Sequence, residues 1–135
     1  RVFPAYRCRD LLFLFDFKES DPVRHLAYTG AELAPVLETL EYLDRAGAAI
    51  RLRCPIIPGL NDRGDHFRSI ARLADRHAGI KAIELLPFHP LGIAKYRRLG
   101  REFELKNLTD RVDDSVVEKY LAEMRQYTAK PVSAE

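Results

Sequence analysis

The chain has 135 residues, of which 47% are apolar and 31% are charged. This length suffices for one domain with a buried core, and the composition excludes a disordered chain as well as a membrane-embedded one. Lysine and arginine number 22 against 20 aspartates and glutamates, and an excess of only +2 gives no reason to expect a nucleic-acid partner.

The apolar runs and the cysteine count indicate in which compartment the protein is located. No apolar run approaches the roughly 18 residues that span a bilayer, and the amino-terminal residues show no pattern of a secretory signal. Cys8 and Cys54 are the only cysteines, which is too few for a disulfide scaffold. We therefore expect a cytoplasmic protein that contacts no membrane.

Strand and helix patterns alternate along the chain. Short apolar segments bounded by turn residues predict buried strands, and apolar residues at helical spacing predict amphipathic helices. In chain order the segments are an irregular stretch 1–9, a strand 11–18, a helix 31–46, a strand 49–57, a helix 65–78, a strand 81–88, a long loop 91–113, a helix 114–128 and a tail 129–135. We expect the end of this tail, 131–135, to be loose.

The ends of the first predicted helix carry their own signals. Thr29 and Gly30 suit its start, Pro35 is compatible with a position in the first turn, and Gly47 suits its end. At the last helix, Asp113 or Asp114 suits the cap.

This order predicts an α/β fold. Each crossover is long enough to return the chain and lay the next strand parallel to the last, with helices covering the sheet. We expect the three strands and their helices to form parallel β-α units. The first and third strands would then be open edges, which predicts self-association.

Polar residues mark the carboxyl end of the first strand. Side chains alternate along a strand, so Phe13, Phe15 and Phe17 should face the helices while Asp16 and Lys18 face the other way. Ligands of parallel α/β folds bind at this end of the strands. From spacing alone, a simple Asp–Lys pair is an equally good interpretation.

Two arginines follow on the second strand. Arg51 and Arg53 share the face opposite the apolar one, where they need a partner or an anionic ligand. Glu84 on the third strand could pair with either. We expect the structural pair for Arg51 and a ligand contact for Arg53, which lies nearer the carboxyl end. His89 follows the third strand between two prolines, at the same end.

Other motifs predict no separate chemistry. The loop at 58–62 (PGLND) reads as a tight turn, because it lacks the glycine pattern of a phosphate loop. His66 and His77 lie eleven residues apart on one helix, about 16 Å at 1.5 Å per residue, so they cannot share a metal ion.

Several blocks together resemble the glycyl-radical enzyme activating enzymes, a family that includes pyruvate formate-lyase activating enzyme. The resemblance runs over residues 10–128. Its blocks are 10–18 with Asp21-Pro22, 25–30 (HLAYTG), Arg53 with 58–62, and 84–96 (ELLPFHPLGIAKY) with Leu99-Gly100.

The resemblance implies a partial (β/α)6 barrel of which this chain is the carboxy-terminal half. It also implies a 4Fe–4S cluster and S-adenosylmethionine (SAM), whose reductive cleavage gives a 5′-deoxyadenosyl radical that takes a hydrogen atom from a glycine of a partner enzyme. Asp16, Lys18, Arg53 and His89 match family positions that bind SAM or line its pocket. Leu86 and Pro55 match positions near the adenine.

The sequence departs from the family in two places. The Cys-x3-Cys-x2-Cys loop that binds the cluster and the Gly-Gly-Glu segment that holds the SAM amino group are both absent. We therefore expect a fragment that supplies SAM-pocket residues and is inactive alone. A non-catalytic docking module, or half of a split barrel completed by another chain, is the alternative; an unrelated enzyme using Asp16, Lys18 and His89 would need the motifs to match by chance.

Overall fold

The computed structural model describes residues 7–89 and 112–135, and its centre is a parallel sheet. The strands are β1 (Leu12–Asp16), β2 (Ala49–Ile56), β3 (Ile80–Pro87) and β4 (Val132–Ala134). They lie in the order β1-β2-β3-β4, and every neighbouring pair is parallel. The predicted α/β fold with parallel β-α units is confirmed.

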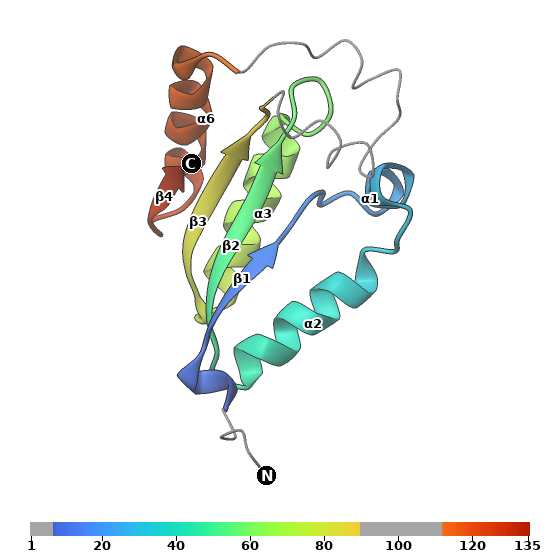
Figure 1. The fold of residues 1–135 in the computed structure, drawn as a ribbon, viewed down its shortest axis with the longest axis vertical. Helices are drawn as coiled ribbons and strands as arrows, with labels where there is room; N and C mark the ends of the chain where they lie inside the picture. Colours follow the sequence, from blue (N-terminus) through green and yellow to red (C-terminus); the bar gives the residue numbers. More distant parts are fainter. Residues whose placement is uncertain (1–6, 90–111) are drawn as a thin grey trace.

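The helices connect these strands. They are η1 (Cys8–Asp10), α1 (Pro22–Thr29), α2 (Ala34–Arg45), α3 (Gly64–Arg76) and α6 (Asp114–Tyr127). In Figure 1, α3 lies behind β2 and β3, and α1 lies at the end of the molecule toward which the strand arrows point. Within the described ranges, no helix has the length and apolar character needed to cross a bilayer.

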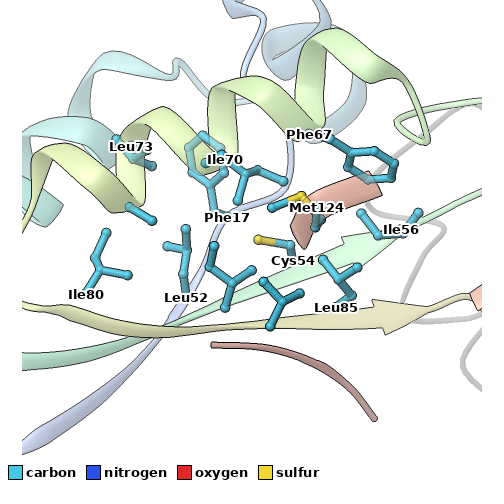
Figure 2. Packing of buried hydrophobic residues seen from close by; sticks show 14 of the residues in the cluster. Phe17, Leu52, Cys54, Ile56, Phe67, Ile70, Leu73, Ile80, Leu85 and Met124 are labelled. Carbon is cyan, nitrogen blue, oxygen red and sulfur yellow. The ribbon is translucent and has the colours of Figure 1, made fainter. Parts of the chain in front are cut away.

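The core fills the space between α3, α6 and one face of the sheet. Figure 2 shows Leu52, Cys54 and Ile56 of β2 pointing toward Phe67 and Ile70 of α3. All five side chains are fully buried. The apolar face of β2 therefore meets the helices, as the alternation of its side chains predicts.

The opposite face of the sheet is open. Leu12 and Leu14 of β1 are 55% and 56% exposed, whereas Phe13 and Phe15 pack against the core and Phe17 is buried in it. The predicted division of the first strand into two faces is thus confirmed.

The connection from β1 to β2 differs from the prediction, because it holds two helices. The Asp21 carboxylate caps α1 by accepting from the N–H groups of Val23 and Arg24. Gly30 adopts φ 76° and ends α1, so the Thr29-Gly30 pair that suits a helix start in fact closes one. Helix α2 then begins at Ala34, with Pro35 in its first turn as expected.

The carboxyl-terminal tail is not loose, contrary to expectation. Val132–Ala134 forms β4 and pairs with β3, so the open edges are β1 and β4 rather than β1 and β3. Lys130 anchors this strand: its Nζ donates to the carbonyl oxygens of Ala74, His77 and Ile80. A cation at the carboxyl end of α3 satisfies carbonyls that the helix itself leaves unpaired. Most of the predicted loop 91–113 lies outside the described residues.

Replacing Lys130 by Met should lower the free energy of unfolding by about 1.5–3 kcal/mol, the range for hydrogen bonds to a charged group. Urea denaturation would measure it. Lys81→Met is the matched control, because Nζ of Lys81 donates only to the exposed Ala78 carbonyl, so its effect should be small. Equal effects of the two substitutions would contradict the anchoring role of Lys130.

Candidate functional site

A row of polar residues crosses the open face of the sheet near the carboxyl ends of the strands. In the strand register Asp16 of β1 lies beside Arg53 of β2, Arg53 beside Glu84 of β3, and Glu84 beside Ser133 of β4. Parallel strands bring these residues to one level because their carboxyl ends point the same way. Asp16 and Arg53, both predicted as site residues, are therefore neighbours.

Arg53 is the centre of this row. Its Nε donates to Glu84 at 2.9 Å, and its Nη2 donates to Glu135 at 3.2 Å. The hydrogen bond to Glu84 is the main reason that the pKa of Arg53 is raised, with Glu135 and Asp16 adding to it. We expected Glu84 to pair with Arg51; this is wrong, because the register sets Arg51 beside Ala82 and Arg53 beside Glu84.

A hollow of about 580 Å³ lies next to the row and joins Arg53 to His89. Strict alternation along β3 would put His89 on the opposite face from Glu84. His89 lies beyond the end of the strand, however, and its exposed side chain lines this hollow. The lining is mixed: Leu86, Phe88 and Val112 are apolar, while Arg53, His89, Asp114, Glu118 and Glu135 carry polar groups. Such a hollow suits a ligand with an apolar body and a few charged groups.

Lys18 stands apart from that hollow. It lines a much smaller one together with Tyr28, Pro55 and Asn61. The structure therefore brings Arg53 and His89 to one hollow, with Asp16 beside Arg53 in the strand register, and it leaves Lys18 in the neighbouring loop. Leu86 shares the hollow of Arg53, and Pro55 shares that of Lys18.

Asn61 fixes the loop that carries Lys18. Its Nδ2 donates to the carbonyl oxygens of Lys18 at 2.9 Å and of Pro55 at 2.7 Å. Its Oδ1 accepts from the N–H of Ile57 at 2.7 Å. The side chain is 4% exposed, so these bonds form away from water. Asn61 thus joins the loop after β1 to the loop after β2.

The next residue, Glu19, is held by a second residue of the same loop. Its carboxylate has no exposed surface and accepts two hydrogen bonds from Arg63, at 2.9 Å and 2.7 Å. This bond to Glu19 is the largest cause of the strongly raised pKa of Arg63. The other side of the guanidinium binds the exposed Asp65.

Ser20, the next residue of the loop, is held by His66 of α3. Its hydroxyl lies 2.9 Å from Nδ1 of His66, whose ring is fully buried and stacks on Phe17 at a centroid distance of 6.0 Å. Burial lowers the pKa of His66 to about 4, so the imidazole is neutral near pH 7. Its Nε2 has no hydrogen-bond partner in the part of the chain that the structure describes.

Sequence reasoning missed the residues that fix the loop after β1, which are Glu19, Asn61, Arg63 and His66. It treated Asn61 as part of a turn and His66 only as a possible metal ligand, and it assigned nothing to Glu19 or Arg63. One signal was present: a glutamate directly after a buried strand and an arginine at the start of an amphipathic helix both lie at the ligand end of the sheet. Their pairing could not be read from spacing, since 44 residues separate them.

The described residues do not fit an iron–sulfur cluster. They contain no group of three His, Cys, Asp or Glu side chains arranged to hold a metal ion. Cys54 is buried in the core and its pKa is raised by burial, whereas a cluster ligand must be a thiolate. Cys54 is therefore a core residue, and no chemistry through a cluster follows from this chain.

Glu19→Gln should lower the free energy of unfolding by about 3 kcal/mol, because removing one charge of a buried ion pair leaves the other without compensation. Asp65→Asn tests the exposed side of the same guanidinium, and we expect no more than about 1 kcal/mol there. Urea denaturation at pH 7 measures both. The buried pair would not be the dominant contact if the two losses were equal.

The buried His66 predicts a pH-dependent stability. The unfolded chain takes up a proton on this histidine below about pH 6.5, whereas the folded chain does so only near pH 4. Stability should therefore fall as the pH drops from about 6.5 to about 4, by a total on the order of 3 kcal/mol for this group.

Chemical denaturation at several pH values measures that slope, and His66→Gln should flatten it. His77→Gln is the control, since His77 directly follows the same helix but is only partly buried. An unchanged slope in His66→Gln would assign the pH dependence to other groups.

Comparison with known proteins places this chain in a family. No family model matches the chain. A benzylsuccinate synthase activating enzyme from Thauera aromatica is 44% identical over 91 residues, 67% of this chain and 28% of that protein. A choline trimethylamine-lyase activating enzyme from Oleidesulfovibrio alaskensis is 32% identical, over 86% of this chain and 38% of that protein. A pyruvate formate-lyase-activating enzyme from Clostridium pasteurianum is 30% identical, over 84% of this chain and 48% of that protein.

A solved structure supports the fold. The crystal structure of a domain of pyruvate-formate lyase-activating enzyme from Bacteroides vulgatus matches with a TM-score of 0.68 at 18% identity, over 92% of this chain and 67% of that chain. The parallel β-α units are thus consistent with a partial TIM-like barrel. The chain spans less than half the length of the three curated relatives named above. Over that part, it belongs to the family of glycyl-radical enzyme activating enzymes.

Proposed function

We propose that this chain is the SAM-contacting part of an activating enzyme that generates a glycyl radical on a partner enzyme such as pyruvate formate-lyase. The observation that carries the proposal is the convergence of Arg53 and His89 on one hollow, with Asp16 beside Arg53 in the register. These residues lie at the carboxyl ends of parallel strands, where α/β folds bind their ligands.

The hollow offers groups that suit SAM. The guanidinium of Arg53 can bind a carboxylate, His89 can donate or accept a hydrogen bond, and Leu86 and Val117 provide apolar surface for a base. In this family SAM supplies the carbon radical when it is bound. What this chain contributes is binding and orientation of SAM, because the described residues provide no cluster site.

The partner is proposed from the relatives. Their names describe activation of benzylsuccinate synthase, choline trimethylamine-lyase and pyruvate formate-lyase. A glycyl-radical enzyme is accordingly the partner we propose for this chain. Self-association through the open edge of β1 is a further proposal that rests on the edge alone.

A second candidate function is a docking module, or half of a split barrel that another chain completes. The open face of β1 favours it, since Leu12 and Leu14 are both more than half exposed there. Exposed apolar side chains on an edge strand commonly mark a contact with another segment or protein. Under this alternative the chain would bind its partner without binding SAM.

Titration calorimetry of the chain with SAM separates the two functions. We expect saturable binding, and Arg53→Ala should weaken it about ten- to a hundredfold, because losing a charge-assisted hydrogen bond costs about 1.5–3 kcal/mol. Arg51→Ala is the matched control: Arg51 lies on the same face of β2, two residues earlier, beside Ala82. Its substitution should leave the affinity unchanged.

Two outcomes would contradict the proposal. Absence of SAM binding by the unmodified chain would favour the docking module. Stoichiometric 5′-deoxyadenosine after reconstitution with iron and sulfide, in the presence of a reductant, would show that the chain is not inactive alone.

A further inference from the structure

Two arginines of this chain use their guanidinium groups differently. A guanidinium has five N–H donors. In Arg63 all of them are used: Nε and Nη2 bind Asp65, Nη1 and Nη2 bind Glu19, and Nη1 also binds the carbonyl of Leu60. Arg63 is saturated and has no donor left for a ligand.

Arg53 is only partly engaged. Among the described residues, Nε binds Glu84 and Nη2 binds Glu135, which leaves both donors of Nη1 and one of Nη2 without a protein acceptor. The end of the guanidinium formed by Nη1 and Nη2 is the end that binds a carboxylate through two parallel hydrogen bonds. Arg53 can therefore take a ligand there, except that Glu135 already holds one Nη2 donor.

The two acidic partners of Arg53 are held with unequal firmness. The Glu84 side chain is 21% exposed and belongs to β3, beside Arg53 in the middle of the sheet. The Glu135 side chain is 68% exposed and follows the short edge strand β4, tied back by a backbone hydrogen bond to Leu85. An exposed ion pair of this kind contributes little and is easily replaced. Glu84 is thus the fixed partner and Glu135 the exchangeable one.

We propose that Glu135 is an internal competitor for the ligand carboxylate at Arg53. Glu84 holds the Nε side and so aims the Nη end at the hollow, while Glu135 occupies Nη2 until the carboxylate of an amino-acid group displaces it. Glu135 is then a specificity-determining residue of the site. The inference rests on the proposed function, because it takes SAM and its relatives as the ligands.

Calorimetry with two probes tests it. S-adenosylhomocysteine carries an amino-acid carboxylate and has no net charge, so a general change in the potential of the hollow affects it little. 5′-Methylthioadenosine has the same adenosine thioether but no carboxylate. Glu135→Gln should tighten binding of S-adenosylhomocysteine about two- to fivefold, the range for an exposed ion pair, and leave 5′-methylthioadenosine unchanged.

Two further variants give the comparison its controls. Glu38→Gln removes an equal charge from an exposed position of α2 that does not line the hollow, and it should change neither affinity. In an Arg53→Lys background, where the planar pair of donors is lost, the gain from Glu135→Gln should disappear. Because the expected effect is a gain in affinity, partial unfolding of a variant cannot imitate it.

The possible results distinguish a failure of the role proposed for Glu135 from a failure of the proposed SAM-binding function. Unchanged or weaker binding of S-adenosylhomocysteine by Glu135→Gln would overturn the inference, the second case by indicating that Glu135 holds the ligand ammonium. An equal gain for both probes would also overturn it, since Glu135 would then act on the shape of the hollow. If the unmodified chain bound neither probe nor SAM, the proposed function itself would fail.

Discussion

The carboxylate of Glu19, which has no exposed surface, is held in the interior by the guanidinium of Arg63, and the geometry of the strand ends depends on this contact. A buried charge is tolerated only when its partner is close and well oriented. The same segment is fixed on either side, through the Lys18 carbonyl by Asn61 and through Ser20 by His66. The loop after β1 is thus specified by the loop and helix that follow β2.

The polar row on the open face has the opposite character. Asp16, Arg53 and Glu84 are all at least partly exposed. Among the described residues, Arg53 donates only to Glu84 and Glu135, so some of its donors have no protein acceptor. A binding site requires fixed backbone positions together with hydrogen-bond donors that can exchange partners. The contacts of Glu19 and Asn61 fix the loop after β1, and the guanidinium of Arg53 supplies such donors. This contrast between Arg63 and Arg53 separates structural from binding roles more clearly than sequence position does.

Much of the fold was predictable, and the misses have physical reasons. The strands were found because buried parallel strands are short apolar runs, and α3 because its apolar residues recur at helical spacing. Helix α1 was missed because it has only eight residues and exposes Val23 and Leu26. Strand β4 was missed because three residues carry no pattern; it forms through pairing with β3 and the anchor at Lys130.

The β-α order, the two faces of the first strands and the family could all be read from the amino-acid sequence, since each follows from local periodicity or from motifs in a fixed order. The sequence also placed Asp16, Lys18, Arg53 and His89 near the strand ends. Only the tertiary structure decided which acid pairs with which arginine. That choice depends on strand register and on side chains far apart in the chain, such as Glu135 beside Arg53, and local spacing carries no information about either.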